Sequence, residues 1–386
     1  MQYVVHYAEV GLKGRNRPRF EARLRTNLER ALRPLGPVQV RRLYGRLLAE
    51  VPDEADPAEV RRRVSGVFGV AWFGRATVTD PSLEAIEQAV DRLVGACEFS
   101  SFGVRSRRVD KRFPMRSSDL NAHLGARVVE ATGARVDLNQ PDLWIEPHIL
   151  SDCVLLPMEK IPGPGGLPVG TGGKAVALIS GGIDSPVAAW AMARRGLELY
   201  YVHFHSAPFT SSASQQKVRD VVRLLAWSQR RTTLFLVPFG ELQQVLVRDA
   251  PAEPRIVLYR RFMLRVAERL AERTGSLALI TGDSLGQVSS QTLGNLDTIN
   301  RAASLPVLRP LIEMDKSEII RRAQEIGTYE TSIEPDEDCC SYLMPRQPAT
   351  WTRPDPIEAI ENKLDVKGMV EDALERVEHE RIEPTP

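Results

Sequence analysis

No apolar run in this 386-residue sequence approaches the roughly 20 residues that a transmembrane helix needs. The opening stretch, MQYVVHYAEVGLKG, also lacks the small and apolar core of a secretory signal peptide. These two absences argue against the membrane-spanning and secreted classes of protein. We therefore expect a soluble cytoplasmic protein that has no membrane among its partners.

Cysteine is scarce as well, with only Cys97, Cys153, Cys339 and Cys340 in the chain. Four cysteines in a chain of this length do not indicate a secreted disulfide framework, and no CxxC spacing supports a zinc or iron–sulfur site. The adjacent pair Cys339-Cys340 then has two interpretations: inert thiols, or a thiol that acts as a nucleophile or sulfur carrier. Neighbouring acids disfavour a thiolate there, but a persulfide is more acidic than a thiol and is less affected.

The formal net charge of +1 hides a strong asymmetry along the chain. Residues 1–46 carry 11 Lys and Arg against 3 Asp and Glu, whereas residues 301–386 carry 11 against 19. A basic beginning suggests an anionic macromolecule, such as a nucleic acid, as its partner. Solvated arginine-rich helix faces would give the same composition, so charge alone leaves both interpretations open.

Apolar periodicity predicts a small β-α-β-β unit over residues 1–54 and a second α/β unit over residues 55–160. The stretch IPGPGGLPVGTGG predicts a linker over residues 161–173. Residues 174–386 alternate short apolar strands with helices, which argues for a doubly wound parallel sheet. We expect the charged tail at residues 356–382 to be helical.

The segment Ser180-Gly181-Gly182-Ile183-Asp184-Ser185-Pro186 follows an apolar strand and precedes a helix-compatible run. This layout directs backbone N–H groups at a phosphate. Ser185 is expected to cap the helix, and Pro186 suits its first position. The string is not GxGxxG, and it is not a Walker A loop, because Pro168 and Ala175 stand where that motif needs Gly and Ser or Thr.

Polar residues also follow two later strands of the predicted sheet. His203-Phe204-His205 ends one of them, and the segment 281–291 follows another, while Arg260 and Arg261 lie on a helix expected to reach the same edge. Together with the glycine-rich loop, these groups could surround an adenine and its phosphates. The two histidines share one strand face, but a metal site would need a third ligand that their neighbourhood lacks.

Lys316 opens a predicted helix that Asp315 caps, with Glu318 at the third helical position. A lysine in the first turn opposes the helix dipole. This unfavourable placement indicates a lysine with a function rather than a surface lysine without one.

A dense basic patch lies in the second α/β unit, flanked by Phe102 and Phe113. Such a patch would bind phosphates in a salt-dependent way, and the aromatic rings could stack on unpaired bases. A solvated surface is the alternative interpretation. The patch consists of Arg105, Arg107, Arg108, Lys111, Arg112 and Arg116.

Taken in order, these motifs resemble one family over nearly the whole chain, the tRNA 4-thiouridine synthetases (tRNA uracil 4-sulfurtransferases). The SGGIDS string is similar to the PP-loop of ATP pyrophosphatases, which split ATP into AMP and pyrophosphate. Residues 7–17 resemble the start of the family's ferredoxin-like domain, and residues 102–149 resemble a THUMP domain, an RNA-binding module. The motifs HFHS, TGDSLGQVSSQT, MDKSEI and DCC complete the set.

The resemblance implies a ferredoxin-like domain over residues 1–54, a THUMP domain over residues 55–160 and a PP-loop domain over residues 174–386. It also implies the reaction. The C4 oxygen of uridine 8 in a tRNA attacks the α-phosphate of ATP, and pyrophosphate leaves. A cysteine persulfide then displaces AMP at C4, and Mg²⁺ assists the adenylation.

The same resemblance assigns roles to individual residues, with no metal site built from protein ligands alone. Asp184 and Lys316 would assist adenylation, and Cys340 would be the catalytic cysteine, with Cys339 as second choice. ATP would be held by Leu178, Ile179, Ser180, Gly181, Gly182, Asp184, Ser185, His203, Phe204, Arg260, Gly282 and Gln291. The tRNA would be bound by Lys13, Arg15 and Arg17 together with the basic patch of residues 105–116.

Some family members carry a C-terminal rhodanese domain whose cysteine delivers the sulfur. Only 46 residues follow Cys340, so we expect the form without that domain. Either a cysteine desulfurase loads Cys340 directly, or another carrier does. The family also implies a homodimer, and a second role in passing sulfur to the thiamine-pathway sulfur carrier protein.

Two alternatives remain at this point. One is another PP-loop RNA modifier, such as a cytidine thiolase or a lysidine synthetase. The iron–sulfur thiolases need the CxxC that is absent, and a THUMP module is not expected in a lysidine synthetase. The other is an RNA-binding protein with an inactive nucleotide site, against which Asp184, Lys316 and Cys340 argue.

Overall fold

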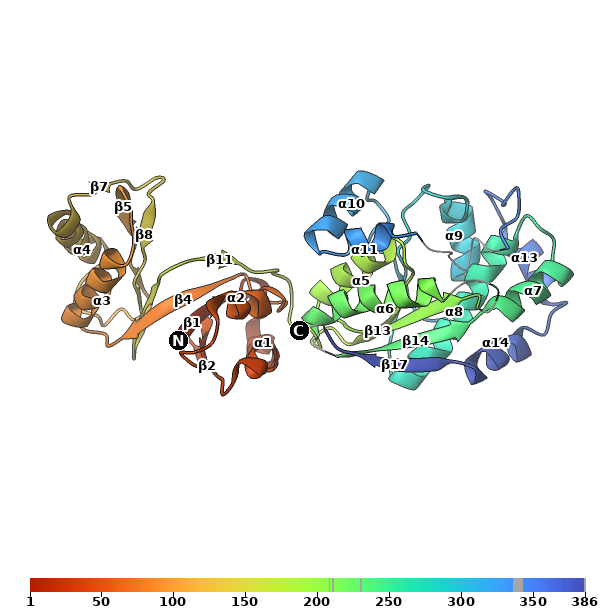
Figure 1. Ribbon diagram of the computed structural model, residues 1–386, viewed down its shortest axis with the longest axis horizontal. Helices are drawn as coiled ribbons and strands as arrows, with labels where there is room; N and C mark the ends of the chain where they lie inside the picture. The colour runs from red at the N-terminus through yellow and green to blue at the C-terminus, as the bar shows by residue number, and fades with distance from the viewer. Residues whose placement is uncertain (208, 210–211, 230, 336–342, 385–386) are drawn as a thin grey trace. The chain divides into compact units, whose positions relative to one another are not determined.

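The computed structural model describes residues 1–207, 209, 212–229, 231–335 and 343–384 (Figure 1). Cys339 and Cys340, which the sequence singles out for sulfur chemistry, lie outside the described residues. The chain divides into two compact units, Met1–Gly166 and Leu167–Pro386. Within the described ranges, no helix is long and apolar enough to cross a membrane.

The first unit begins with a sheet covered by helix α1 (Arg17–Leu32). Leu24, Leu28 and Leu32 recur every four residues, so one face of α1 is apolar, and all three are fully buried. The other elements here are β1 (Gln2–His6), η1 (Glu9–Leu12), η2 (Gly14–Asn16), η3 (Arg33–Leu35), β2 (Gln39–Leu43), β3 (Arg46–Glu50) and α2 (Pro57–Ser65).

Strand β4 (Trp72–Thr79) connects this part to the rest of the unit. Its first half pairs with β1, and its second half pairs with β10 (Val154–Pro157). One sheet, with strand order β2-β3-β1-β4-β10-β9-β6, therefore runs through the unit. The predicted domain boundary at residue 54 falls before β4, the strand that completes the sheet around β1. This boundary stays a prediction.

The second half of the unit has its own core between helices α3 (Leu83–Gly95) and α4 (Ser117–Thr132), built on Val90, Phe102 and Leu124. Phe102 lies in β5 (Ser101–Val104), the middle strand of a small sheet of order β7-β5-β8. The remaining strands are β6 (Arg107–Arg108), β7 (Arg135–Val136), β8 (Leu143–Ile145), β9 (His148–Ile149) and β11 (Ile161–Pro162).

The expected linker at residues 161–173 is divided between the two units. β11 pairs with β4 in the first unit, whereas the Leu167 and Gly170 amides donate to the carbonyls of Arg194 and Gly196 in the second. The glycines and prolines therefore serve ordered turns as well as a connection.

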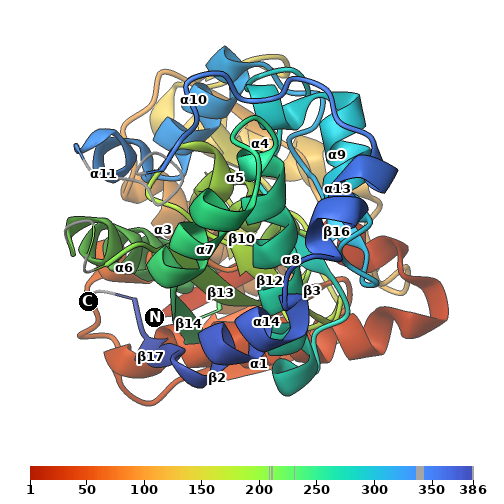
Figure 2. The ribbon, with the colours of Figure 1, turned by 90° about the vertical axis from the view of Figure 1, so that its right-hand side faces the viewer.

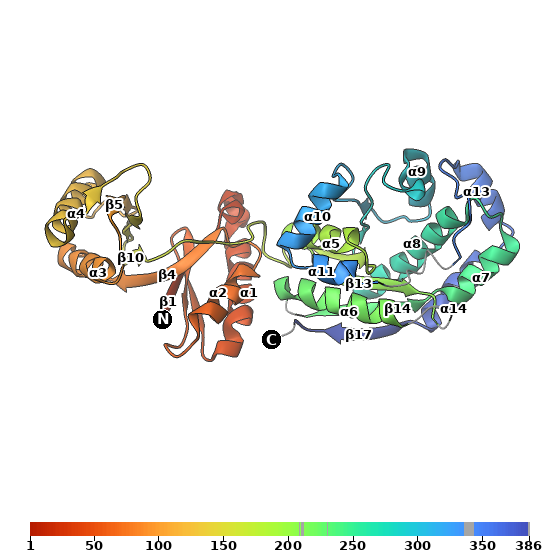
Figure 3. The ribbon, with the colours of Figure 1, turned by 45° about the horizontal axis from the view of Figure 1, so that its top comes forward.

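The second unit is the doubly wound sheet that the sequence predicts. Its strand order is β16-β15-β12-β13-β14-β17, and every pairing is parallel except that of β17 with β14. Strands β13, β14 and β17 are labelled in Figure 3. The strands are β12 (Lys174–Leu178), β13 (Glu198–His205), β14 (Thr232–Pro238), β15 (Leu279–Ile280), β16 (Val307–Leu308) and β17 (Glu378–Ile382).

Helices cover both faces of this sheet (Figure 2). α5 (Asp184–Arg194) and α6 (Ala213–Leu225) pack on one face, and α8 (Arg255–Thr274) and α14 (Val366–Glu375) pack on the other. The others are η4 (Ala226–Ser228), α7 (Gly240–Asp249), η5 (Ser289–Gln291), α9 (Leu293–Asn300), α10 (Lys316–Glu325), α11 (Tyr329–Ile333) and α13 (Pro354–Glu361).

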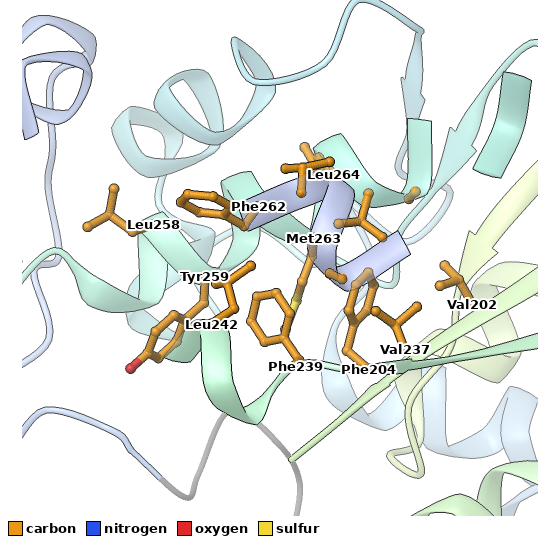
Figure 4. Close-up of a cluster of buried hydrophobic side chains, with 14 of the residues drawn as sticks. Val202, Phe204, Val237, Phe239, Leu242, Leu258, Tyr259, Phe262, Met263 and Leu264 are labelled. Atoms are coloured by element: carbon orange, nitrogen blue, oxygen red, sulfur yellow. The ribbon is translucent and has the colours of Figure 1, made fainter. Parts of the chain in front are cut away.

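The core on the α8 face is aromatic (Figure 4). The Phe204 and Phe239 rings meet edge to face at 5.3 Å between centroids, and Phe239 meets Tyr259 in the same way at 6.3 Å. Edge-to-face pairs stabilise a core beyond the burial of their area. Phe204 and the neighbouring Met263 are therefore well packed at the carboxyl ends of the strands.

The tail corrects one expectation. Residues 356–382 are helical only in α13 and α14, and Glu378–Ile382 forms the edge strand β17 instead. Its charged residues suit an edge, where one side of the strand meets solvent. Glu380 pairs with Arg219 of α6 at 2.7 Å, and Ile382 is buried, so both helical cover and sheet pairing hold the strand.

Candidate active site

The sheet changes direction between β12 and β15, because the chain builds strands on one side of β12 and then crosses to the other. Ligands bind at such a point, beyond the carboxyl ends of the strands. A cavity of about 350 Å³ lies there. It is lined by Leu178, Ile179, Ser180, Asp184, Ser185, His203, Phe204, Ile256, Arg260, Met263, Leu264, Thr281, Gly282, Asp283, Val288, Ser289, Ser290, Gln291, Ile299, Arg309 and Met344.

The glycine-rich loop forms one wall of the cavity, but Ser185 does not cap the helix as the sequence predicts. Helix α5 begins at Asp184, with Ile183 before it and no side-chain cap. The Ser185 hydroxyl instead accepts a hydrogen bond from the Ser180 amide at 2.9 Å, which closes the loop on itself. The first N–H groups of α5 therefore have no capping side chain and can meet an anion.

Gly282 lets β15 approach this loop closely. A Cβ atom at position 282 would lie 2.7 Å from the Ser185 nitrogen and 2.9 Å from the Asp184 carbonyl carbon. No side chain fits there without moving the backbone of α5. The glycine therefore sets the distance between the two strand ends that frame the cavity.

Asp184 is held from two sides at the entrance to the loop. Lys316 Nζ lies 2.6 Å from Asp184 Oδ1, and Gln287 Nε2 donates to Oδ2 at 3.3 Å. The predicted capping box is present, with Asp315 and Glu318 bonded to each other's backbone amides. It fixes the first turn of α10 and so presents the Lys316 ammonium to Asp184.

Asp283 organises the opposite wall and is almost fully buried. It pairs with Arg260, with Arg309 Nε at 3.1 Å and with the Thr281 hydroxyl at 2.7 Å. Burial alone would raise the pKa of Asp283, but the charges of the two arginines and the hydrogen bonds from Arg260 and Thr281 outweigh it and hold this pKa below its ordinary value. Two guanidinium groups against one carboxylate leave this wall positive.

The structure brings most of the predicted ATP residues together. All of them line the cavity except Gly181 and Gly182, which lie in the loop beside it. Gln291 is buried, and its Oε1 has no partner among the described residues, so it can accept a hydrogen bond from a ligand. His203 Nδ1 lies 3.1 Å from the Ile179 carbonyl oxygen, so the histidine ring braces the end of β12.

Sequence reasoning missed several lining residues that the fold supplies. Asp283 lies in the segment 281–291 that the sequence places at this edge, although no role was assigned to it individually. Arg309 could have been found, because it directly follows β16. Gln287 lies in the same segment and bonds to Asp184 without lining the cavity. Met344 carries no sequence signal, because a loop brings it to the cavity. Arg261, expected near the rim, is buried against Glu361 of α13 and does not line the cavity.

The predicted RNA-binding residues all lie in the first unit and differ in how many contacts they make with other residues of the chain. Arg17 is bonded to Glu21, Arg108 to two backbone carbonyls and Arg112 to Asp110. The Arg105 guanidinium lies over the Trp144 ring at 4.0 Å, and Lys13 lies over Phe20. Exposed residues without an ion pair among the described residues are Arg15, Arg105, Arg107, Lys111 and Arg116.

Fold and cavity together define a nucleotide-binding doubly wound domain that follows a smaller α+β unit with basic surface residues. Residues 170–366 match the model of the family described as thiamine biosynthesis protein (ThiI). Residues 2–74 match the ThiI ferredoxin-like domain, and residues 81–158 match the THUMP domain. The chain belongs to the ThiI family, which confirms the resemblance seen in its motifs.

Named relatives and solved structures agree with this assignment. The chain is 45% identical to a probable tRNA sulfurtransferase of Thermus thermophilus, over 96% of this chain and 91% of that protein. It is 43% identical to one of Brevibacillus brevis, over 99% and 96%. A crystal structure of a 4-thiouridine synthetase–RNA complex with bound ATP matches with a TM-score of 0.90 and 36% identity, over 99% of both chains.

Proposed function

We propose that this chain is a tRNA sulfurtransferase that uses ATP to make 4-thiouridine at uridine 8. The observation that carries the proposal is the full-length likeness to a 4-thiouridine synthetase seen with RNA and ATP, at a TM-score of 0.90. The curated relatives named tRNA sulfurtransferase support it from sequence. We assign ATP to the switch-point cavity, because most of the predicted ATP residues line it.

The cavity supports an adenylation mechanism. ATP would lie with its phosphates near the N-terminus of α5 and the positive wall made by Arg260 and Arg309. The uridine C4 oxygen attacks the α-phosphate, and Lys316 stabilises the negative charge that develops on the phosphate oxygens. Pyrophosphate leaves, and the base keeps AMP as a good leaving group at C4.

The residues fit Mg²⁺ held largely by substrate phosphates. Mg²⁺ commonly takes one or two carboxylates and completes its shell with phosphates and water. Among the described residues, no group of three or more His, Cys, Asp or Glu is placed to hold a metal ion, so these residues form no metal cage. We assign Asp184 as the carboxylate, and the ion would neutralise phosphate charge.

The sulfur step is assigned to Cys340. A persulfide on this residue would attack C4 and displace AMP, and a reducing thiol would then cleave the sulfur–sulfur bond so that only the terminal sulfur stays on the base. We propose a cysteine desulfurase as the persulfide donor. We also propose that the protein delivers sulfur to the thiamine-pathway carrier protein. We propose further that it acts as a homodimer in the cytoplasm.

Incubation of the full chain with tRNA, ATP, Mg²⁺, sulfide and dithiothreitol tests the enzyme. We expect tRNA-dependent release of AMP and pyrophosphate, together with the near-ultraviolet absorbance of thiouridine. An RNA-binding protein with an inactive site would bind the tRNA and produce neither.

Two matched variants test the cysteine. Cys340→Ser should keep AMP formation and lose thiolation from a persulfide donor, whereas Cys339→Ser should keep both. Normal persulfide-dependent thiolation by Cys340→Ser would reject this assignment.

A further inference from the structure

An exposed tryptophan lies on a loop beside the ATP cavity. Trp351 is 64% exposed, although it belongs to a large and apolar residue type. It follows Met344, which lines the cavity, in a segment (residues 343–353) that contains no acidic residue. Tryptophan is enriched where proteins contact their partners, so an exposed indole at this place is a candidate contact.

The indole rests flat against Gly294 of α9. A Cβ atom at position 294 would lie 2.8 Å from indole Cδ2 and 2.9 Å from Cε2. These are the two atoms that the fused rings share, so the glycine faces the middle of the ring plane and not its rim. One face of the indole is therefore supported by the helix, and the large exposure leaves the other face open to a planar group.

Hydrogen bonds hold this loop to the wall of the cavity. The fully buried Asn295 donates from Nδ2 to the carbonyl oxygens of Ser289, at 2.7 Å, and Ala349, at 2.9 Å. Its Oδ1 accepts from the Thr352 hydroxyl at 2.8 Å. Since Ser289 lines the cavity, Asn295 fixes the position of Trp351 relative to the nucleotide site.

The charges around the tryptophan favour a nucleic acid over a protein. Arg346 and Arg353 are exposed, and neither forms an ion pair among the described residues. Exposed arginines on the same loop as an open aromatic face are a combination by which proteins bind single-stranded nucleic acid, with phosphates on the cations and a base on the ring.

We propose that Trp351 is a stacking platform for an unpaired base of the tRNA substrate. Arg346 and Arg353 contact the adjoining phosphates, and together they position the target uridine over the ATP cavity. This inference rests on the proposed function and adds a positioning site in the second unit to the RNA-binding residues of the first.

Tryptophan substitutions test the platform through AMP formation with tRNA and ATP and no sulfur donor. Loss of one base–aromatic stack should raise the KM for tRNA roughly 5- to 150-fold in Trp351→Ala. Trp351→Phe should recover most of the loss, because any aromatic ring can stack. The KM for ATP at saturating tRNA and the thermal midpoint should stay unchanged.

Leu293→Ala is the matched control, since Leu293 is 69% exposed, lies next to Gly294 and is not aromatic. Its KM for tRNA should equal that of the original chain. Arg346→Gln and Arg353→Gln should each lower the salt dependence of tRNA binding, by about 0.7 in the log–log slope.

Three other outcomes would overturn the platform. One is an unchanged KM for tRNA in Trp351→Ala. Another is an equal effect of Leu293→Ala, which would indicate general apolar docking. The third is a Trp351→Ala defect that appears only when a persulfide donor supplies the sulfur, which would indicate a protein partner. Failure of the original chain to form AMP with tRNA would instead reject the proposed function.

Discussion

The contact between Asp184 and Lys316 is the one at which we expect a single substitution to reduce the proposed activity most. The two groups begin helices α5 and α10, lie 132 residues apart in the sequence and meet at 2.6 Å beside the cavity. Asp184→Asn or Lys316→Met should reduce tRNA-dependent AMP formation on the order of 10²- to 10³-fold, because charge stabilisation of the transferring phosphate is lost.

The folding stability of the two variants should show whether the loss of AMP formation comes from lost chemistry or from a damaged fold. Both side chains are partly exposed, so the free energy of unfolding should change by no more than about 0.5 kcal/mol. Glu325→Gln is the control, since it removes an exposed ion pair with Arg322 on the same helix. Equal activity loss in the control and in Lys316→Met would argue against a catalytic role for the lysine.

At single residues, sequence patterns predict the positions that follow strand ends and miss those that depend on packing. Gly282 was expected to hold ATP, yet its absent side chain also makes room for the backbone of α5. Ser185 was expected to cap α5 but bonds to Ser180. The role of Gly282 depends on a close approach between segments about 100 residues apart, which no local pattern contains. The role of Ser185 depends on how the loop folds back on Ser180, which the capping pattern does not specify.

At the scale of helices and strands, a buried ion pair joins α8 to α13, and no local sequence pattern predicts it. Glu361 accepts from Arg261 at 2.6 and 2.8 Å and from Arg265 at 2.7 and 2.8 Å. Burial would raise the pKa of Glu361, but hydrogen bonds and charge from both arginines outweigh it and lower this pKa. The carboxylate is therefore ionised and central to the contact.

Glu361→Gln should destabilise the second unit by about 3–5 kcal/mol, because Arg261 would stay buried without a full counter-charge. The midpoint of urea unfolding, followed by near-ultraviolet circular dichroism, measures this. Glu371→Gln is the control, since it breaks an exposed α8–α14 pair with Arg269 and should cost less than about 1 kcal/mol. Similar shifts in both variants would contradict the importance of burial.

The helix and strand pattern itself was largely predictable, because buried parallel strands form continuous apolar runs that alternate with amphipathic helices. The edge strand β17 was not, since its sequence EHERI reads as a charged helical tail. Its conformation comes from the backbone partners that β14 offers, a tertiary effect that overrides local propensity.

At the scale of a whole unit, pH should act through two histidines of the first unit. Burial and the charges of Arg46 and Arg107 lower the pKa of His148 to about 3, and the same causes lower that of His6 to about 4. Both are therefore neutral when folded, and His148 Nδ1 meets the buried Arg46.

Stability of this unit should fall as the pH drops from about 6.5, the ordinary histidine pKa, towards 4, because the unfolded chain takes up protons that the folded chain does not. Each histidine contributes at most about 1.4 kcal/mol per pH unit to this slope. Denaturant midpoints between pH 5 and 7 should show a shallower slope in His148→Gln, and an unchanged slope would refute the buried neutral state.

Binding of tRNA by the first unit should depend on salt through its exposed cations. Lys111→Gln and Arg116→Gln should each weaken binding and lower the slope of log K against log salt by about 0.7 to 0.9. Arg127→Gln is the control, since its guanidinium is paired with Asp91 at 2.7 Å on helices α3 and α4. A slope that responds equally to all three variants would mean that the patch has no special role.

The edge strand β17 has a consequence for how the second unit folds. β14 pairs with residues that follow it by about 150 positions, since Thr232 lies opposite Ile382. Until the ribosome has released residue 382, the outer backbone of β14 stays unpaired, and exposed strand edges invite association with other chains. Contacts of such long range also form slowly. We infer that the nascent second unit depends on protection of this edge, and that shortening the chain before Glu378 would yield aggregation rather than a smaller working enzyme.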